Sequence, residues 1–212
     1  MKLFLSALLS FSVFFGMAQN DPAAKAILDK VSAKYKTLKT VQANYNLNVT
    51  NRQGKNAGKK TGMIYLKGIK YKITEKSLEI TSNGIKMWKF EPSANEVTTS
   101  TVDNSAQMLT PQKLFTNFYD KDFLYKLNGD KKVGKKTLSE IELTPLDKRK
   151  SFFKVYVYVD KAQQLIVSSK IYENSGNVYD YNISNLKTNL PLDDKMFVFD
   201  KATHAGVEEI EQ

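Results

Sequence analysis

VQANYNLNV, residues 41–49, is the stretch of sequence that decides the fold. Its odd-numbered positions are apolar or small, and the positions between them are a glutamine and three asparagines. A period of two is typical of a β-strand that buries one face and exposes the other to water. The stretch therefore predicts a half-buried strand, and its neighbours on both sides extend the pattern.

A helix is predicted directly before this strand. Asp21-Pro22 has the form of an N-cap followed by proline at the first helical position. Ile27, Val31, Tyr35 and Leu38 then recur at helical spacing, with lysines on the opposite side. The helix is amphipathic, so it needs an apolar surface to lie on.

Short alternating segments separated by turn residues continue after Val49. The predicted strands are Gly62–Lys67, Ile69–Thr74, Leu78–Thr81, Lys86–Phe90, Glu96–Thr101, Phe123–Leu127, Leu138–Thr144, Phe152–Asp160, Leu165–Tyr172, Asn177–Ile183 and Met196–Phe199. Asn128-Gly129, Asp160-Lys161 and Ser175-Gly176 mark turns between neighbours. Roughly ten or eleven antiparallel strands predict one large sheet that curls or closes into a barrel.

Two segments within this region stand out. Thr110-Pro111 begins a second predicted helix, whose Leu114, Phe115 and Phe118 form one stripe that we expect to pack across the sheet. Phe152–Asp160 is apolar on both faces, which is typical of a strand covered on both sides. Strict alternation would place Phe153 on the same face as Val155, Val157 and Val159. It would place Phe152 on the opposite face, with Tyr156 and Tyr158.

The first residues indicate the compartment. Lys2, the apolar run Leu3–Phe15 and the small residues around Met17 form the three parts of a secretory signal peptide. We therefore expect a cleaved signal peptide over residues 1–18 and a single domain over residues 19–212, outside the cytoplasm. The alternatives are an uncleaved anchor and a buried first helix. No later segment is apolar enough to span a bilayer, which predicts a soluble mature protein.

The amino-acid composition excludes several classes of site and function. The chain has no cysteine, which excludes disulfides, thiolate metal sites and a cysteine nucleophile. The net charge of +10 comes almost wholly from lysine, because Arg52 and Arg149 are the only arginines. Nucleic-acid readers depend on arginine, so the lysines indicate either a surface that faces anionic headgroups or acidic partners, or a solvated coat.

The sequence offers no set of catalytic residues. His204 is the only histidine, and as a lone residue we expect it at the surface, without the partners that a triad or a metal site needs. Ser151 and Lys154 match S-x-x-K, but on a predicted strand the two side chains fall on opposite faces. No metal or cofactor is expected, and the pattern favours a protein that is not an enzyme.

Taken in order, the segments resemble the periplasmic outer-membrane lipoprotein carrier family, LolA. The resemblance rests on the helix running into VQANYNLNV, on GMIYLKGIKYKI, on LEITSNGIKMWKFEPSANEV, on LTP, on VDKAQQLI and on the ending MFVFDKATHAGVEEIE. It implies a mostly β fold with α-helices, an unclosed antiparallel β-barrel of about eleven strands covered by a helical lid. It also implies a hydrophobic cavity that shields the acyl chains of lipoproteins between the inner and the outer membrane.

Family positions can be carried over residue by residue. The implied acyl-chain cavity residues are Ile64, Leu66, Tyr71, Ile73, Ile80, Trp88 and Phe90, with Lys89 pointing outward. The implied lid residues are Ile27, Val31 and Tyr35 in the first helix and Leu114, Phe115 and Phe118 in the second. Better-known members carry an arginine at the strand corner that helps to hold the lid shut. This chain has Lys67-Gly68 there, so Lys67 is the candidate lid-locking donor, and apolar contact alone is the alternative.

The implied partners are acylated lipoproteins, an inner-membrane ABC lipoprotein-release complex, and an acceptor or membrane surface at the outer membrane. The resemblance implies a periplasmic monomer that does not bind nucleic acid. Three other functions remain open: a carrier or sensor of another lipid or amphiphile, an interaction module that binds no ligand, and a lipid hydrolase or isomerase.

Overall fold

The computed structural model describes residues 20–102 and 119–212. The predicted signal peptide and the stripe Leu114, Phe115 and Phe118 lie outside the described residues. In the part that is described, no helix is long and apolar enough to cross a membrane.

Helix α1 (Pro22–Lys36) forms where the sequence predicts it. The Asp21 carboxylate accepts hydrogen bonds from the N–H groups of Ala23 and Ala24, which satisfies two donors that the first turn leaves unpaired. The buried side of the helix consists of Ala24, Leu28, Val31, Ser32 and Tyr35. The amphipathic pattern thus sets which side of α1 meets the sheet.

Twelve strands follow. They are β1 (Val41–Thr50), β2 (Asn56–Lys67), β3 (Lys70–Glu75), β4 (Glu79–Ser82), β5 (Lys86–Glu91), β6 (Glu96–Thr101), β7 (Phe123–Val133), β8 (Lys136–Pro145), β9 (Phe152–Asp160), β10 (Leu165–Glu173), β11 (Val178–Thr188) and β12 (Glu208–Glu211). The short helices are α3 (Tyr119–Asp122), which leads into β7, and the 3-10 turns η1 (Asp194–Phe197) and η2 (Lys201–Thr203).

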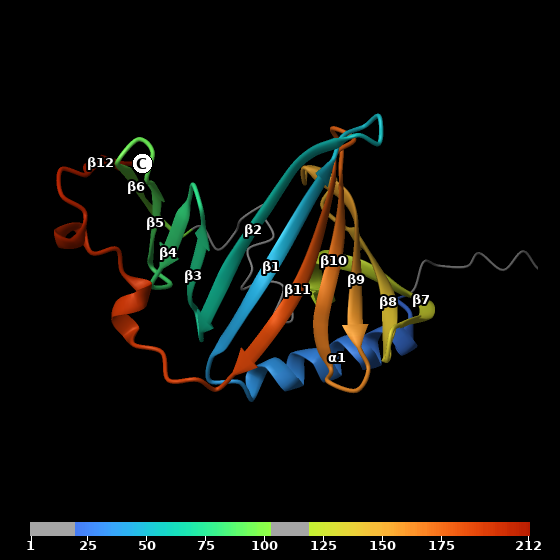
Figure 1. The fold of residues 1–212 in the computed structure, drawn as a ribbon. Coiled ribbons are helices and arrows are strands. Elements are labelled where there is room, and N and C mark those ends of the chain that lie inside the picture. Colours follow the sequence, from blue (N-terminus) through green and yellow to red (C-terminus); the bar gives the residue numbers. More distant parts are fainter. Residues whose placement is uncertain (1–19, 103–118) are drawn as a thin grey trace, which may run out of the picture.

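All twelve strands belong to one sheet, in the order β12-β6-β5-β4-β3-β2-β1-β11-β10-β9-β8-β7 (Figure 1). Neighbouring strands are antiparallel except β12, which lies parallel to β6. β7 and β12 are the two edges, so the sheet stays open. This confirms the predicted mostly β, unclosed antiparallel fold, with one strand more than the about eleven that the family resemblance implies.

Two predicted segments near chain turns are wrong. Asn128-Gly129 is not a turn, because β7 continues to Val133 and absorbs the pair in a bulge where Gly129 has φ +122°. The chain turns instead at Gly134. Met196–Phe199 is not a strand, because Asp193 caps the 3-10 turn η1 and accepts a hydrogen bond from the Lys195 N–H.

A second bulge corrects the predicted faces of β9. Tyr172 of β10 pairs with Lys154, and Glu173 pairs with Phe152, so Phe153 is the extra residue. Phe152 is therefore buried, whereas the Phe153 side chain is 51% exposed. Strict alternation predicts the reverse, with Phe153 on the face of Val155 and Phe152 on the opposite face.

The core lies mainly on one face of the sheet, called here the inner face because α1 packs against it. α1, β7, β8, β9 and β10 enclose a filled cluster that includes Leu28, Ile141, Leu143, Val155 and Val157. A second inner cluster lies on β1, β2 and β3, and Leu38 and Leu186 contact both clusters. The opposite, outer face carries a smaller third cluster near the β12 edge.

Candidate functional site

Strand register brings the apolar residues of β1 to β4 together on the inner face. Directly paired residues of neighbouring antiparallel strands share a face. Val41 pairs with Leu66, and Ala43 pairs with Ile64. The row then continues through Ile64–Ile73, Leu66–Tyr71 and Ile73–Ile80. Five of the predicted cavity residues, Ile64, Leu66, Tyr71, Ile73 and Ile80, thus lie on one continuous surface.

This surface, called here the apolar inner surface, is only partly covered. Ile64, Leu66 and Tyr71 are buried, whereas Ile73, Ile80, Met87 and Ile183 at its margins are partly exposed. The Tyr71 hydroxyl contacts the Met87 Sδ at 3.2 Å, which gives the surface a soft, adaptable side chain. Large apolar side chains left partly open on an inner face can take up a further apolar group.

Trp88 and Phe90 are not part of this surface. Thr81 pairs with Trp88, and Glu79 pairs with Phe90, whereas Ile80 pairs with Lys89. The expectation that Trp88 and Phe90 share the face of Ile80 and that Lys89 points away is therefore wrong, because the turn from β4 to β5 sets the opposite parity.

Trp88 and Phe90 instead build the outer cluster with the C-terminal segment. Phe90 packs with Val97 and Val207, and its ring centroid lies 5.3 Å from Phe199 and 4.5 Å from His204. His204 also stacks on Phe199 at 4.5 Å. His204 is partly exposed, as its prediction as a surface residue requires, but it does not stand alone because it packs in this aromatic cluster.

Among the predicted lid residues, those of α1 cover the other half of the sheet. Val31 and Tyr35 are buried in the cluster of β7–β10, and Ile27 packs against that cluster. They touch the filled half of the inner face rather than the row from Ile64 to Ile80. Leu114, Phe115 and Phe118 lie outside the described residues, so their predicted place over the cavity stays a prediction.

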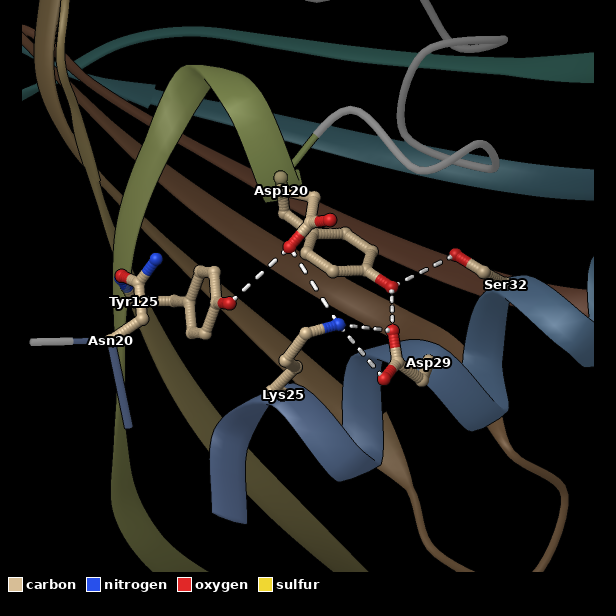
Figure 2. A network of polar contacts seen from close by, with 7 residues as sticks. Asn20, Lys25, Asp29, Ser32, Asp120 and Tyr125 are labelled. Atoms are coloured by element: carbon tan, nitrogen blue, oxygen red, sulfur yellow. Dashed lines mark hydrogen bonds and ion pairs between the residues drawn. The ribbon is translucent and has the colours of Figure 1, made fainter. Parts of the chain in front are cut away.

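A network of polar groups fastens α1 to α3 and β7 (Figure 2). The Tyr119 hydroxyl donates a hydrogen bond to Asp29 Oδ1 at 2.8 Å, and Ser32 Oγ donates to the Tyr119 hydroxyl at 3.5 Å. Lys25 Nζ lies 3.1 Å from the Asp29 carboxylate and 3.7 Å from Asp120. The Tyr125 hydroxyl donates to Asp120 Oδ1 at 3.4 Å. We call these residues, Lys25, Asp29, Ser32, Tyr119, Asp120 and Tyr125, the polar latch.

The contacts of the polar latch shift the pKa values of Asp29 and Tyr119. The hydrogen bond from Tyr119 lowers the pKa of Asp29, and the ion pair with Lys25 adds to the effect. Burial of the Tyr119 hydroxyl, followed by its bond to Asp29, raises the pKa of Tyr119 to about 12. α3 follows residues 103–118, which contain the predicted lid helix, so the latch holds α1 against the point where the chain enters β7.

Lys67 contacts the C-terminal segment, including Asp194 at the start of η1. Its Nζ donates to the Leu192 carbonyl at 2.7 Å and lies 2.9 Å from Asp194 Oδ1. Lys70 binds the other oxygen of Asp194 at 3.0 Å, and these two lysines lower the pKa of the Asp194 carboxyl. Among the described residues Lys67 thus clamps the C-terminal segment, and its predicted lid-locking role stays a prediction because the second predicted helix lies outside them. The polar latch is a contact that the sequence prediction missed.

The inner face becomes polar toward the end where β1 turns into β2. The Tyr45 hydroxyl donates a hydrogen bond to the Glu75 carboxylate at 2.5 Å, and Lys60 Nζ lies 3.3 Å from the same carboxylate. The Tyr45 ring passes over Gly62, where an added Cβ would approach that ring to 2.8 Å. This polar group marks one limit of the apolar inner surface.

No feature of the described residues points to catalysis. No group of three His, Asp or Glu residues among them could hold a metal ion. Ser151 precedes β9, and Lys154 on that strand pairs with Glu142 at 3.3 Å. A surface pocket of about 600 Å³ lies at the opposite end of β9, lined by Lys135, Lys136, Thr137, Asp160, Lys161, Ala162 and Gln163. Asp160 is ion-paired to Lys136 there.

The family described as outer membrane lipoprotein carrier protein LolA matches residues 36–200. The chain belongs to this family. The match spans β1–β11 and the apolar inner surface, and it confirms the resemblance drawn from the sequence. No curated protein matches the chain by sequence.

Several solved structures are similar to this LolA family member. An uncharacterized conserved protein from Thermus thermophilus has a TM-score of 0.61 and 11% identity, over 90% of this chain and 99% of that one. A DUF1329 family protein from Desulfovibrio piger has a TM-score of 0.50 and 16% identity, over 87% and 100%. Lipoprotein LppX from Mycobacterium tuberculosis has a TM-score of 0.50 and 13% identity, over 82% and 99%. At these identities the likeness shows the fold alone.

Proposed function

We propose that this chain is a periplasmic carrier that shields the acyl chains of lipoproteins and moves them from the inner to the outer membrane. Membership of the LolA family and the partly exposed apolar inner surface support the proposal. The carrier would receive its cargo from an inner-membrane ABC lipoprotein-release complex and deliver it to an acceptor or a membrane surface at the outer membrane. No chemical step is part of this function.

The physical need for such a carrier is large. Each CH₂ group removed from water contributes ~0.8 kcal/mol, so one sixteen-carbon chain left in water costs on the order of 10 kcal/mol. Shielding it requires a broad apolar surface and no catalytic group. The row from Ile64 to Ile80 is the observation that carries the proposal, because it presents adjoining apolar side chains from neighbouring strands.

The proposal is tested with an inner-surface variant and a matched control. Ile80→Glu places a carboxylate on the apolar inner surface, where Ile80 is partly exposed. Val133→Glu places the same group at the β7–β8 turn, where Val133 is 57% exposed. We expect Ile80→Glu to lose at least about tenfold in affinity for a triacylated lipopeptide, because a charge must then be desolvated against the acyl chains.

Native mass spectrometry of the purified proteins with the lipopeptide measures the bound fraction, and thermal unfolding checks the fold of each variant. Val133→Glu should bind like the unmodified protein. The proposal is wrong if the unmodified protein takes up no acylated ligand, or if the two variants lose binding equally while remaining folded.

A further inference from the structure

The β8–β9 hairpin combines exposed apolar side chains with basic ones. Leu146 directly follows β8 and Phe153 is the second residue of β9, and each side chain is 51% exposed. Between them in the chain stand Lys148, Arg149 and Lys150. A loop of this composition meets the two requirements of an interfacial anchor, apolar groups that enter the acyl boundary and cations that meet headgroup phosphates.

The bulge in β9 is what exposes Phe153. Regular alternation would place this ring on the inner face beside Val155, but the extra residue directs Phe152 inward and leaves Phe153 on the outside, 6.2 Å from the Tyr172 ring. Leaving a large apolar side chain half in water is unfavourable. Bulges commonly re-aim a side chain at a functional site, and here the re-aimed side chain is aromatic.

The charge around the hairpin favours an anionic surface. Lys148 and Lys150 form no ion pair with any described residue, whereas Arg149 is held by Asp147 at 2.9 Å. The 174–176 turn lies beside the hairpin, since Asn174 N–H donates to the Ser151 carbonyl at 2.8 Å. Gly176 of this turn lies directly beside the Arg52 side chain, since a Cβ added to Gly176 would be 2.8 Å from the Arg52 Cγ. Both arginines of the chain therefore gather at this end of the sheet.

We propose that the hairpin tip formed by Leu146, Lys148, Arg149, Lys150 and Phe153 docks this protein on an anionic bilayer surface. Leu146 and Phe153 enter the headgroup region, and Lys148 and Lys150 contact lipid phosphates. Asp122, whose carbonyl accepts a hydrogen bond from the Leu146 N–H, Asp147 and Glu173 are acidic residues of the neighbourhood. They are outnumbered by the four cations Arg52, Lys148, Arg149 and Lys150. The proposal does not require the carrier function, because docking needs no cargo.

Vesicle flotation of the cargo-free protein tests the docking. We expect binding to vesicles of phosphatidylethanolamine with phosphatidylglycerol, little binding to phosphatidylcholine vesicles, and release at high ionic strength. Leu146→Ser with Phe153→Ser should weaken the partition about tenfold. Lys148→Gln with Lys150→Gln should weaken it about thirtyfold, since two cations that face anionic headgroups are removed.

Two matched controls carry equal changes elsewhere on the surface. Ile69→Ser with Ile85→Ser removes two isoleucines that are 56% and 69% exposed at other turns. Lys132→Gln with Lys135→Gln removes two charges at the β7–β8 turn. Both controls should bind vesicles like the unmodified protein. Equal losses in the controls, or no preference for anionic vesicles, would overturn the proposal.

A fluorescence reading locates the contact. Trp88 is the only tryptophan, so Phe153→Trp in a Trp88→Phe background reports on the tip alone. Its emission should shift to the blue on anionic vesicles and be quenched by brominated lipids. An unshifted, unquenched emission on bound protein would place the contact elsewhere and overturn the proposal.

Discussion

The two halves of the inner face arise from the same strand alternation but differ in how they are covered. Under α1, residues such as Ile141, Leu143 and Val157 are wholly removed from water. On β3 and β4, Ile73 and Ile80 belong to the same face and remain partly open. The first half is a structural core that holds the sheet, and the second is the surface to which we assign cargo. Burial, rather than hydrophobicity alone, separates the two roles.

The largest expected effect separates the halves by stability. Leu143→Ala should lower the free energy of unfolding by about 2–5 kcal/mol, because the cavity that it leaves is enclosed on all sides. Ile80→Ala should cost only about 1 kcal/mol, because its site is already partly open to water. Urea unfolding followed by circular dichroism measures both. Equal losses would mean that the β1–β4 half is ordinary core.

Breaking the polar latch should lower the free energy of unfolding by a smaller amount, because the latch stabilises only the α1 half of the inner face. Tyr119→Phe removes the hydroxyl that donates to Asp29 and should cost about 1–2 kcal/mol of unfolding free energy. Asp194→Asn, which breaks the clamp with Lys67 and Lys70, is the comparison from the β1–β4 half. The latch assignment fails if Tyr119→Phe unfolds at the same denaturant concentration as the unmodified protein.

The latch also predicts a pH dependence. Because folding lowers the pKa of Asp29, its ionised carboxylate stabilises the folded state. This stabilisation is complete above the ordinary pKa of 3.8 and is lost as the pH falls through the lower pKa of the folded state. Because folding raises the pKa of Tyr119, its neutral hydroxyl stabilises the folded state below pH 10.0, and this stabilisation is lost as the pH rises toward about 12. The stability difference between the unmodified protein and Tyr119→Phe should therefore shrink at both extremes. A difference that stays constant with pH would contradict the latch geometry.

The smallest expected effect concerns the clamp of the C-terminal segment. Asp194→Asn should cost no more than about 1 kcal/mol, because the ion pairs of Asp194 are solvent-exposed. Its acyl binding should be unchanged, since Lys67 and Lys70 pair one position beyond Leu66 and Tyr71 and therefore fall on the opposite face of the sheet. Thermal unfolding measures the change in stability, and native mass spectrometry with the lipopeptide measures acyl binding. Loss of acyl binding in Asp194→Asn would contradict a purely structural role for this clamp.

Sequence periodicity predicted most of the fold because it is a local signal. The helix before Val41 and the strands beginning at Val41, Glu96 and Phe152 lie where their alternation places them. The pattern also failed in local ways. MFVFD, residues 196–200, alternates like a strand, but Met196 and Phe197 belong to the 3-10 turn η1 that Asp193 caps. Residues 208–211 are not among the predicted strands, yet β12 forms there by pairing with β6.

The candidate site was predicted only in part because face assignments depend on register. Within β5 the sequence correctly separates Trp88 and Phe90 from Lys89, but a one-residue difference in the preceding turn decides which set faces inward. The polar latch joins Asp29 to Tyr119 across 90 positions. No spacing rule connects residues so far apart, so only the folded chain reveals the contact.

Methyl NMR with a spin-labelled lipopeptide tests the central claim most directly, because every isoleucine is observed in one experiment. The label is carried on an acyl chain of a triacylated lipopeptide, and the δ1 methyl signals of the isoleucines are followed during titration. We expect selective broadening at Ile73 and Ile80, with Ile141 under α1 unaffected. Broadening that is equal at Ile141, or absent from Ile73 and Ile80 while the lipopeptide is bound, would contradict the assignment of cargo to the open half of the inner face.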